Sequence, residues 1–388
     1  MIPRRIRLSL QSSLLVSLSM CFVALNASAS MIPKAPEIEA TGYLLMDANS
    51  GQILVEHNAD ERLPPASLTK MMTSYIAASE LHSNHISLKD KVPVSVQAWK
   101  MGGSRMFIRE GTDVSVDDLL HGIIIQSGND ASVAMAEYLA GSEGAFADMM
   151  NQQAALLGMN DSHFMNATGW PADNHYSSAR DLATLARHII NDFPEHYGLY
   201  AKKSFTYNGI SQDNRNFMLW RDARIDGLKT GHTEAAGYCL VSSAIEGDMR
   251  LISVVMGADS EKARARETQK LITYGFRFYE TYKAYSEGDA LTQVRVWLGQ
   301  QNELSLGPAE DLILTIPRDS HDQLKAEMTV NADVTAPIRK GDVLGTAVIR
   351  MNGEVLLEKP LIALNDVDEA GFFKRTWHHI LRFFSNLF

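Results

Sequence analysis

Cysteine is almost absent from this sequence, with Cys21 and Cys239 as its two examples in 388 residues. Cys21 lies in an amino-terminal segment that we expect to be removed, so the mature chain would keep one thiol and form no intrachain disulfide. A chain of this length can bury enough apolar surface to fold without such cross-links. Cys239 follows Tyr238 in an apolar run, which favours a small buried side chain over a nucleophile or a metal ligand.

Positive charge is also in deficit, with 36 Lys and Arg against 46 Asp and Glu and a net charge of −10. That sign is wrong for holding a polyanion, so no nucleic-acid partner is expected. The sequence shows no Gly-rich phosphate loop. Its 12 histidines are scattered, and only His378 and His379 adjoin each other, without an acidic partner at ligand spacing. We therefore expect no metal site and no cofactor.

Long apolar runs are missing except near the amino terminus. Three arginines among the first seven residues precede an apolar stretch that serines interrupt, and the stretch closes on small residues up to Ala29. It is short for a bilayer-spanning helix and is typical of a secretory signal peptide. Met20 is not the small residue that a lipoprotein site needs before Cys21. We therefore expect residues 1–29 to be cleaved and the protein to be exported without a lipid.

The last residues, 371–388, are basic and aromatic and contain no acid. Their apolar side chains recur at helical spacing and basic side chains fill the other face, which predicts an amphipathic helix lying in a membrane interface. The alternative is a terminal helix docked on its own domain. An exported protein with such a tail would be a peripheral protein on the periplasmic face of the bacterial inner membrane. The predicted apolar face holds Phe373, Trp377, Ile380, Leu381, Phe384 and Phe388, and the polar face holds Lys374, Arg375, His378 and Arg382.

Between these ends, residues 30–283 have the pattern of an α+β domain. A hairpin signal lies at the start and strand-like runs lie near the end, so we expect one sheet that places the first hairpin beside the later strands. The predicted strands are 42–47, 52–56, 238–243 and 251–256, and the predicted helices are 67–81, 115–160 with a junction at 127–129, 178–191 and 260–282.

Residues 284–365 differ in character from the preceding domain. They contain strand-like runs at 293–298 and 312–316 and many turn residues, which predicts a small β-sandwich-like domain. Residues 366–388 then lead into the amphipathic helix.

Ser67 and Lys70 form the first candidate for chemistry. A serine becomes a good nucleophile when a neighbouring base takes its proton, and side chains at i and i+3 lie on one face of a helix. A lysine shielded from water can be neutral near pH 7 and accept that proton. The pattern alone is weak, because a capped helix start followed by a solvated lysine would look the same.

Two further motifs contain polar residues where a cleft would need them. Ser127-Gly128-Asn129 stands at a junction between two helical patterns, which can project a hydroxyl and an amide together. Lys229-Thr230-Gly231 ends in a residue without a side chain, so a ligand backbone could pair along that strand while Lys229 and Thr230 bind a carboxylate. Each motif by itself has an ordinary structural explanation.

The ordered set of Ser-x-x-Lys, Ser-Gly-Asn and Lys-Thr-Gly resembles the penicilloyl serine transferases. More narrowly, residues 65–70, 226–233 and 236–238 are similar to the D-alanyl-D-alanine carboxypeptidases, the low-molecular-mass penicillin-binding proteins of groups five and six. The resemblance covers nearly the whole chain, from the signal peptide to the tail. It implies a β-lactamase/transpeptidase-like catalytic domain, an antiparallel sheet with a helical subdomain, followed by an all-β domain.

The resemblance also implies a role for each motif residue. Ser67 would be the acylated nucleophile, Lys70 its base and Ser127 a proton relay, with oxyanion-hole N–H groups on Ser67 and His232. The substrate would be a peptidoglycan muropeptide ending in D-Ala-D-Ala, and β-lactam antibiotics would acylate the same serine. The substrate-binding residues would be Asn129, Lys229, Thr230, Gly231, His232, Arg215 and Arg264.

The chain departs from this family at one loop. The family usually shows Gly-Leu where this sequence has Gly169-Trp170, which would alter the substrate edge of the cleft. No glutamate matches the deacylating glutamate of class A β-lactamases, and Asp173 and His175 suit loop structure better than a base. The alternatives are a β-lactamase or D,D-endopeptidase on the same scaffold, and a non-catalytic wall-binding scaffold protein.

Overall fold

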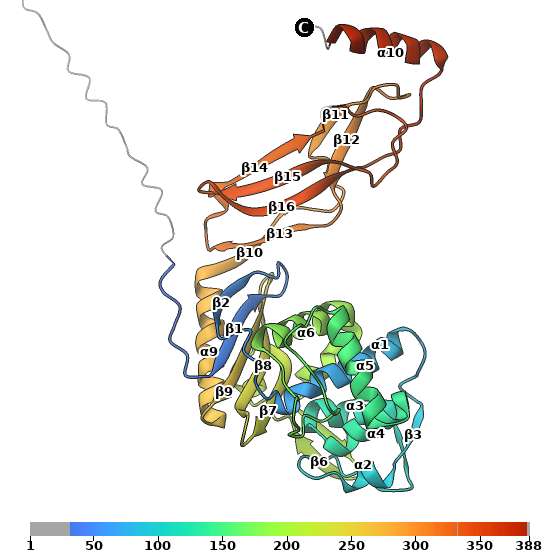
Figure 1. Ribbon diagram of the computed structural model, residues 1–388. Coiled ribbons are helices and arrows are strands. Elements are labelled where there is room, and N and C mark those ends of the chain that lie inside the picture. Colours follow the sequence, from blue (N-terminus) through green and yellow to red (C-terminus); the bar gives the residue numbers. More distant parts are fainter. Residues whose placement is uncertain (1–31, 332, 386–388) are drawn as a thin grey trace, which may run out of the picture.

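The structure, a computed structural model, describes residues 32–331 and 333–385. Figure 1 shows a lower domain that mixes helices and strands, an all-β domain above it, and helix α10 (Phe372–Ser385) at the far end. The predicted signal peptide of residues 1–29 lies outside the described residues. Within the described part of the chain, no helix is long and apolar enough to cross a membrane.

One five-stranded antiparallel sheet forms the centre of the lower domain, in the strand order β2-β1-β9-β8-β7. The amino-terminal hairpin joins the later strands through β1 and β9, where Leu44 lies opposite Val254. This confirms the predicted sheet and leaves β7 as an edge strand. The strands are β1 (Gly42–Asp47), β2 (Ile53–His57), β7 (Ile225–Thr233), β8 (Gly237–Glu246) and β9 (Met249–Ala258).

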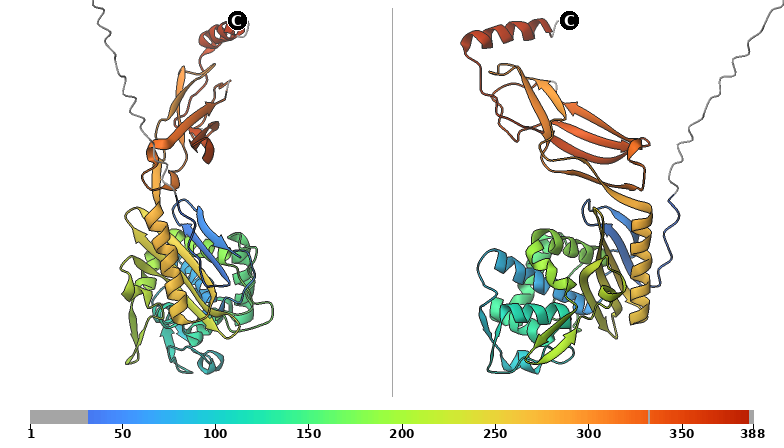
Figure 2. Two further views of the ribbon diagram at one scale, coloured as in Figure 1. Left: turned by 90° about the vertical axis from the view of Figure 1, so that its left-hand side faces the viewer. Right: turned by 180° about the vertical axis from the view of Figure 1, so that it is seen from behind.

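Helices cover both faces of this sheet (Figure 2). On one face, α9 (Glu261–Phe278) packs through an apolar cluster that includes Leu45 and Leu271. On the other face, a larger cluster joins the sheet to α1 (Lys70–His82) and α6 (Ala179–Asp192). Because α1 is buried among these elements, the residues at its amino-terminal end have a fixed position beside β7.

The helical subdomain is completed by α2 (Val96–Lys100), α3 (Val116–His121), α4 (Asn129–Ala140) and α5 (Glu143–Leu156). The predicted helical region 115–160 has its junction at Ser127, whose φ of 64° is left-handed. It has a second break at Gly141 (φ 79°) and ends earlier than predicted, at Leu156. Left-handed residues of this kind end a helix.

Two predicted elements extend too far along the chain near and within the all-β domain. The helix predicted for 260–282 ends at Phe278, and β10 (Tyr279–Tyr285) follows it and pairs with β13 (Leu312–Pro317). Aromatic and β-branched residues in β10 favour a strand that packs against a neighbour. The strand predicted for 293–298 ends at Arg295, and Leu298 adopts a left-handed φ of 60°.

Several short elements were missed in the sequence, because few residues define them. They are β3 (Lys91–Pro93), β4 (Asp113–Ser115), β5 (Ser204–Tyr207), β6 (Ile210–Asp213), α7 (Pro194–Tyr197) and α8 (Met218–Arg221).

The upper domain is all-β, as predicted. A five-stranded antiparallel sheet of order β11-β12-β16-β15-β14 and the β10–β13 pair enclose one apolar core, to which Leu306, Leu314 and Ile349 belong. The strands of the larger sheet are β11 (Thr292–Arg295), β12 (Glu303–Pro308), β14 (Leu324–Val330), β15 (Val343–Met351) and β16 (Glu354–Ala363).

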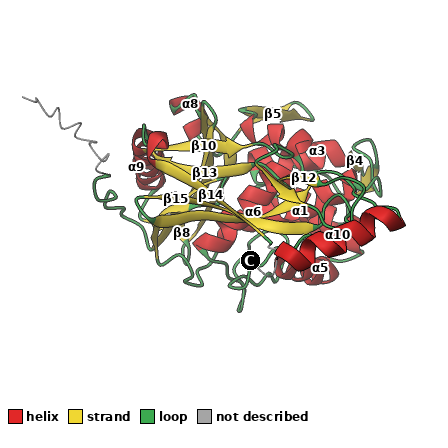
Figure 3. Ribbon diagram, turned by 90° about the horizontal axis from the view of Figure 1, so that it is seen from above, coloured by secondary structure: helices red, strands yellow, loops and turns green. Residues whose placement is uncertain are grey.

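Helix α10 rests on this domain through part of its polar face. Lys374 Nζ donates to the carbonyl of Gln300 at 2.7 Å, and the N–H of Leu298 donates to Nδ1 of the buried His378 at 2.9 Å. Seen from above in Figure 3, α10 and α9 lie at opposite sides of the picture. Basic and histidine side chains of α10 thus contact the all-β domain.

The predicted apolar face of α10 is largely uncovered. Phe373 is 88% exposed, Trp377 is 59% exposed and Ile380 is 45% exposed. Phe388 lies outside the described residues, as do the side chains of Arg382 and Phe384. The described part of the helix therefore offers an aromatic surface to its surroundings.

Candidate active site

Ser67 lies in a short 3-10 helix, Ala66–Thr69, that continues directly into α1. Two glycines allow other elements to approach this turn closely. A Cβ atom on Gly231 of β7 would lie 3.2 Å from the Ser67 nitrogen, and one on Gly169 would lie 1.8 Å from the Ala66 carbonyl oxygen. Any side chain at position 169 would collide with that carbonyl. The serine therefore stands where α1, the edge strand and the loop around Gly169 meet.

Lys70 lies one helical turn after Ser67 and is 1% exposed. Its Nζ donates to Asn129 Oδ1 at 2.8 Å and to the carbonyl of Thr168 at 2.6 Å. Nζ also forms a third hydrogen bond, with Ser67 Oγ at 3.1 Å. A neutral amine in this place has two N–H groups for the two acceptors and a lone pair for the serine hydroxyl.

Burial lowers the pKa of Lys70 to about 7, because an ammonium group loses its hydration inside the protein. The negative charges of Asp130 and Glu143 act in the opposite direction and raise that pKa. A substantial share of Lys70 is therefore neutral at physiological pH. The pair can transfer a proton from the serine hydroxyl to the lysine amine.

Ser127 is the left-handed residue that follows a π-helical turn, Gly122–Gln126, and Gly128 separates it from the start of α4. Lys229 on β7 donates from Nζ to Ser127 Oγ at 2.9 Å and to the carbonyl of Thr230 at 3.0 Å. Burial lowers the pKa of Lys229 well below its usual range, and the cationic Lys70, Arg264 and Arg215 lower it further. The helical junction and the edge strand thus place the Ser127 hydroxyl beside the Lys229 amine.

The cleft around Ser67 has two arms that share Ser67, Ser104 and His232. The first arm is a cavity of about 270 Å³ whose lining includes the cationic Arg215 and Arg264. We call it the arginine arm. Its remaining lining residues are Ser127, Thr230, Gly231, Tyr238 and Glu261.

Arg264 is 5% exposed and is fixed on α9. Its guanidinium donates to the carbonyl of Gly231 at 3.3 Å and pairs with Glu261 at 3.0 Å. Arg215 is exposed and lines the same arm. The structure thus brings both predicted arginines to the arm in which Thr230 and Gly231 lie.

The second arm is a cavity of about 340 Å³ and has no acidic, lysine or arginine side chain in its lining. We call it the tryptophan arm. Asn129 lies in it, with its amide nitrogen donating to the carbonyl of Gly102 at 2.8 Å. Its other lining residues are Gly103, Thr168, Gly169, Trp170, Pro171 and Thr233.

The site contains supporting residues that the sequence motifs did not reveal. Asp130 is buried, and its carboxylate accepts the N–H groups of Met106, Phe107 and Ile108 at 2.9–3.2 Å. These bonds fix residues 106–108, which follow Ser104 closely in the chain. The position of Asp130 next to Ser127-Gly128-Asn129 was the only signal for it in the sequence.

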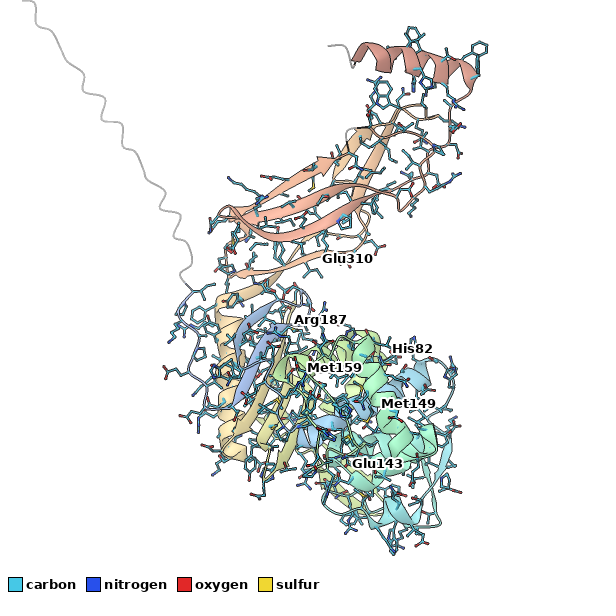
Figure 4. The ribbon with its side chains drawn as sticks, viewed as in Figure 1. His82, Glu143, Met149, Met159, Arg187 and Glu310 are labelled. Atoms are coloured by element: carbon cyan, nitrogen blue, oxygen red, sulfur yellow. The ribbon has the colours of Figure 1, made fainter. Side chains whose placement is uncertain are left out.

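Glu143, which is labelled in Figure 4, supports the loop that contains Ala167 and Thr168. Its carboxylate accepts the N–H of Ala167 at 3.1 Å, next to the carbonyl of Thr168 that binds Lys70. Burial raises the pKa of Glu143. Nothing in the sequence near the motifs pointed to this residue.

His175 is a structural residue of the same loop, as predicted. Its Nδ1 accepts the N–H of Met165 at 3.2 Å, so Nε2 bears the proton and donates to Thr69 Oγ1 at 2.8 Å. Burial lowers the pKa of His175 to about 4, which keeps the ring neutral at pH 7. Asp173 is exposed in the loop.

The fold places a serine beside a buried lysine in a cleft, an arrangement that suits a serine enzyme. The family model described as D-alanyl-D-alanine carboxypeptidase matches residues 29–260, and the one described as penicillin-binding protein 5, C-terminal domain, matches residues 279–369. Among the described residues, no group of three or more His, Cys, Asp or Glu side chains is placed to hold a metal ion.

Similar proteins agree with these matches. The D-alanyl-D-alanine carboxypeptidase DacC of Escherichia coli (strain K12) is 44% identical over 369 residues, which cover 93% of this chain and 92% of DacC. Penicillin-binding protein 5 of Haemophilus influenzae superposes with a TM-score of 0.84 at 42% identity, over 87% of this chain and all of that structure. Penicillin-binding protein 6B of E. coli gives a TM-score of 0.73 at 38% identity, over 85% of this chain and 97% of that structure.

The chain therefore belongs to the D-alanyl-D-alanine carboxypeptidase family and is a serine peptidase of that family.

Proposed function

We propose that this protein removes the terminal D-alanine from peptidoglycan side chains that end in D-Ala-D-Ala, through an acyl-enzyme on Ser67. One observation carries the proposal: the buried Lys70 amine, whose pKa is about 7, lies 3.1 Å from Ser67 Oγ in a cleft with a cationic arm. That cleft suits a substrate with a carboxylate next to the scissile bond.

The first half of the reaction acylates the enzyme. Neutral Lys70 takes the hydroxyl proton as Ser67 Oγ attacks the carbonyl carbon of the penultimate D-alanine. The N–H groups of Ser67 and His232 stabilise the oxyanion. As the C–N bond breaks, a proton passes through the Ser127 hydroxyl to the nitrogen of the departing D-alanine.

Binding energy in this step comes from the ends of the substrate. The terminal carboxylate lies in the arginine arm, next to Thr230, with Arg215 and Arg264 as its charge partners. The substrate backbone pairs along the free edge of β7 at Gly231, where no side chain intervenes. Asn129 holds the amide of the acyl portion, and Lys229 keeps the Ser127 hydroxyl in position. Water then hydrolyses the ester and frees Ser67.

Penicillin is proposed to acylate Ser67 in the same way, since its β-lactam carbonyl and carboxylate match those of the substrate terminus. The loop of residues 166–176 offers His175 as a neutral structural group and no glutamate beside the ester. Without a dedicated base to activate water, the adduct should persist, which favours a carboxypeptidase over a β-lactamase.

The proposal is tested by incubating the purified protein with a D-Ala-D-Ala pentapeptide and, separately, with benzylpenicillin. We expect continuous release of free D-alanine and one slowly decaying penicilloyl group per molecule. Rapid turnover of penicillin would indicate a β-lactamase. Cleavage restricted to cross-linked muropeptide dimers would indicate an endopeptidase, and no release with no adduct would indicate a wall-binding scaffold protein.

Replacing Glu143 by Gln is expected to move the acidic limb of the kcat/KM profile to lower pH, by roughly half a unit or more. The Glu143 carboxylate raises the pKa of Lys70, so its loss lowers that pKa and leaves more neutral amine at a given pH. Glutamine can still accept the N–H of Ala167. Asp148→Asn, an exposed change of equal charge on the same helix, is the control and should leave the limb in place. A limb that stays or moves upward contradicts this expectation.

We also propose that the protein is exported and held peripherally at the periplasmic face of the inner membrane by residues 371–388. The exposed Phe373, Trp377 and Ile380 support this location, because such a surface gains by leaving water for a membrane interface. The basic residues that flank it suit an anionic surface.

Deleting residues 371–388 is expected to shift the protein from the membrane fraction to the soluble fraction. The double substitution Phe373→Glu and Trp377→Glu should act in the same direction, because it charges the exposed face and keeps the Lys374 and His378 contacts. Val343→Glu, at a 60% exposed position of the all-β domain, is the matched control. Unchanged fractionation of the deletion variant would rule out this anchor.

A further inference from the structure

Trp170 holds a large apolar ring in water at the rim of the cleft. The residue is 50% exposed, yet its backbone is fixed. Its N–H donates to Asn166 Oδ1 and to Thr168 Oγ1, both at 3.1 Å, and its carbonyl accepts from Asn166 Nδ2 at 2.9 Å. An exposed tryptophan on an ordered loop next to the proposed nucleophile can bind an apolar part of the substrate.

The ring itself packs against a backbone that leaves room for it. A Cβ atom on Gly102 would lie 3.6 Å from the indole carbon Cη2, and one on Gly103 would lie 3.4 Å from Cζ3. The added atom on Gly103 would also lie 2.8 Å from Asn129 Nδ2. The two glycines therefore let the indole and the Asn129 amide stand together in the tryptophan arm.

The direction of the substrate assigns this arm to the acyl side. In the proposed function the terminal carboxylate occupies the arginine arm, and both arms meet at Ser67. The peptide that precedes the scissile bond must therefore leave through the tryptophan arm. Asn129, Thr168 and Ser104 offer polar groups there for the peptide amides, and the indole offers the apolar surface.

The distance along the substrate from the scissile bond determines which part of the substrate reaches Trp170. Its neighbour Gly169 touches the turn that carries Ser67, so the ring lies within about one or two residues of the acyl D-alanine. The glycan is attached several residues farther away, at about 3.5 Å per extended residue. A side chain on the residue before D-Ala-D-Ala lies within reach.

We propose that Trp170 is a specificity-determining residue, whose indole packs on the side chain of the residue before D-Ala-D-Ala and favours a long aliphatic chain there. This inference rests on the proposed function. The tryptophan arm lacks a charged side chain to select a carboxylate or an ammonium group, so the methylene groups supply the contact.

The test compares two peptides, Nα,Nε-diacetyl-L-lysyl-D-alanyl-D-alanine and Nα-acetyl-L-alanyl-D-alanyl-D-alanine, with kcat and KM measured for D-alanine release. In Trp170→Leu we expect the ratio of kcat/KM for the lysyl peptide to that for the alanyl peptide to fall roughly 3- to 10-fold, mainly through KM. Trp170→Phe should retain most of the ratio, because it keeps an aromatic face.

Trp220→Leu is the matched control, since Trp220 is 48% exposed and contacts Lys203 outside both arms. Its ratio should equal that of the unaltered protein. The inference is overturned if the ratio stays constant in Trp170→Leu, if it falls equally in Trp220→Leu, or if only glycan-bearing muropeptides respond to the change. A protein that releases no D-alanine from either peptide would instead refute the proposed function.

Discussion

Ser67→Ala is expected to lower D-alanine release by at least about 10⁴-fold and to eliminate covalent labelling by penicillin. The substitution removes one oxygen atom, and with it the only atom that can form the acyl bond in the proposed reaction. The turn that holds position 67 depends on backbone packing against Gly169 and Gly231, which alanine preserves. D-alanine release and gel fluorescence with a labelled penicillin measure the two losses.

Ser83→Ala serves as the control, because Ser83 is an exposed serine just beyond the other end of α1. It should retain full activity and full labelling. Labelling that persists in Ser67→Ala would place the nucleophile elsewhere. Equal thermal unfolding temperatures for the two variants would show that the loss in Ser67→Ala is chemical.

Lys70→Arg is expected to lower kcat/KM by roughly 10²- to 10⁴-fold or more. Arginine keeps the positive charge and the donors but stays protonated, so it cannot take the Ser67 proton. In the unaltered protein, kcat/KM should fall as the pH drops below about 7, where Lys70 becomes protonated. The sign follows from the base being active in its neutral form.

The role of Lys70 is tested by two independent measurements, the rate of the Lys70→Arg variant and the pH profile of the unaltered protein. Lys89→Arg, at an exposed position, should leave the rate and the pH profile unchanged. The larger arginine side chain could fail to fit beside Asn129 and Thr168 and unfold the variant. In that case the pH profile of the unaltered protein still tests whether Lys70 is the base. An acidic limb near the ordinary pKa of lysine, or no limb at all, would contradict the role of Lys70 as the base.

Much of the site could be anticipated because its chemistry lies in short motifs. Ser67 and Lys70 share one helix face through local geometry alone, and the structure places them 3.1 Å apart. The pairing of Ser127 with Lys229 is different, since 102 residues separate them along the chain. Their proximity could be expected only from the family resemblance. It depends on the position of β7 beside the helical subdomain.

The supporting residues could not be predicted, because their roles depend on long-range packing. The contribution of Thr168 is a backbone carbonyl, which no residue type reveals. Asp130 and Glu143 act through N–H groups of loops that are distant in sequence from their helices. Acidic residues at the first turn of a helix are common, so Glu143 had no distinguishing signal and Asp130 had only its position next to the Ser-Gly-Asn motif.

The fold was predicted most reliably in the central sheet. The hairpin and the strands of the central sheet combine as expected, because their apolar runs are flanked by turn residues. The helix predicted for 260–282 was too long, since the sequence around Tyr279 is compatible with both structures. Residues 279–285 form a strand because they pair with β13. Such a distant partner cannot be seen in a local sequence pattern.

The central claim is that Ser67, activated by Lys70, becomes the acylated residue of a carboxypeptidase. The most direct test is mass spectrometry of the purified protein after brief exposure to benzylpenicillin, followed by proteolysis and location of the adduct. We predict one penicilloyl group per molecule, on the peptide that contains Ser67. An adduct on any other residue, or an intact protein without an adduct, would contradict the account.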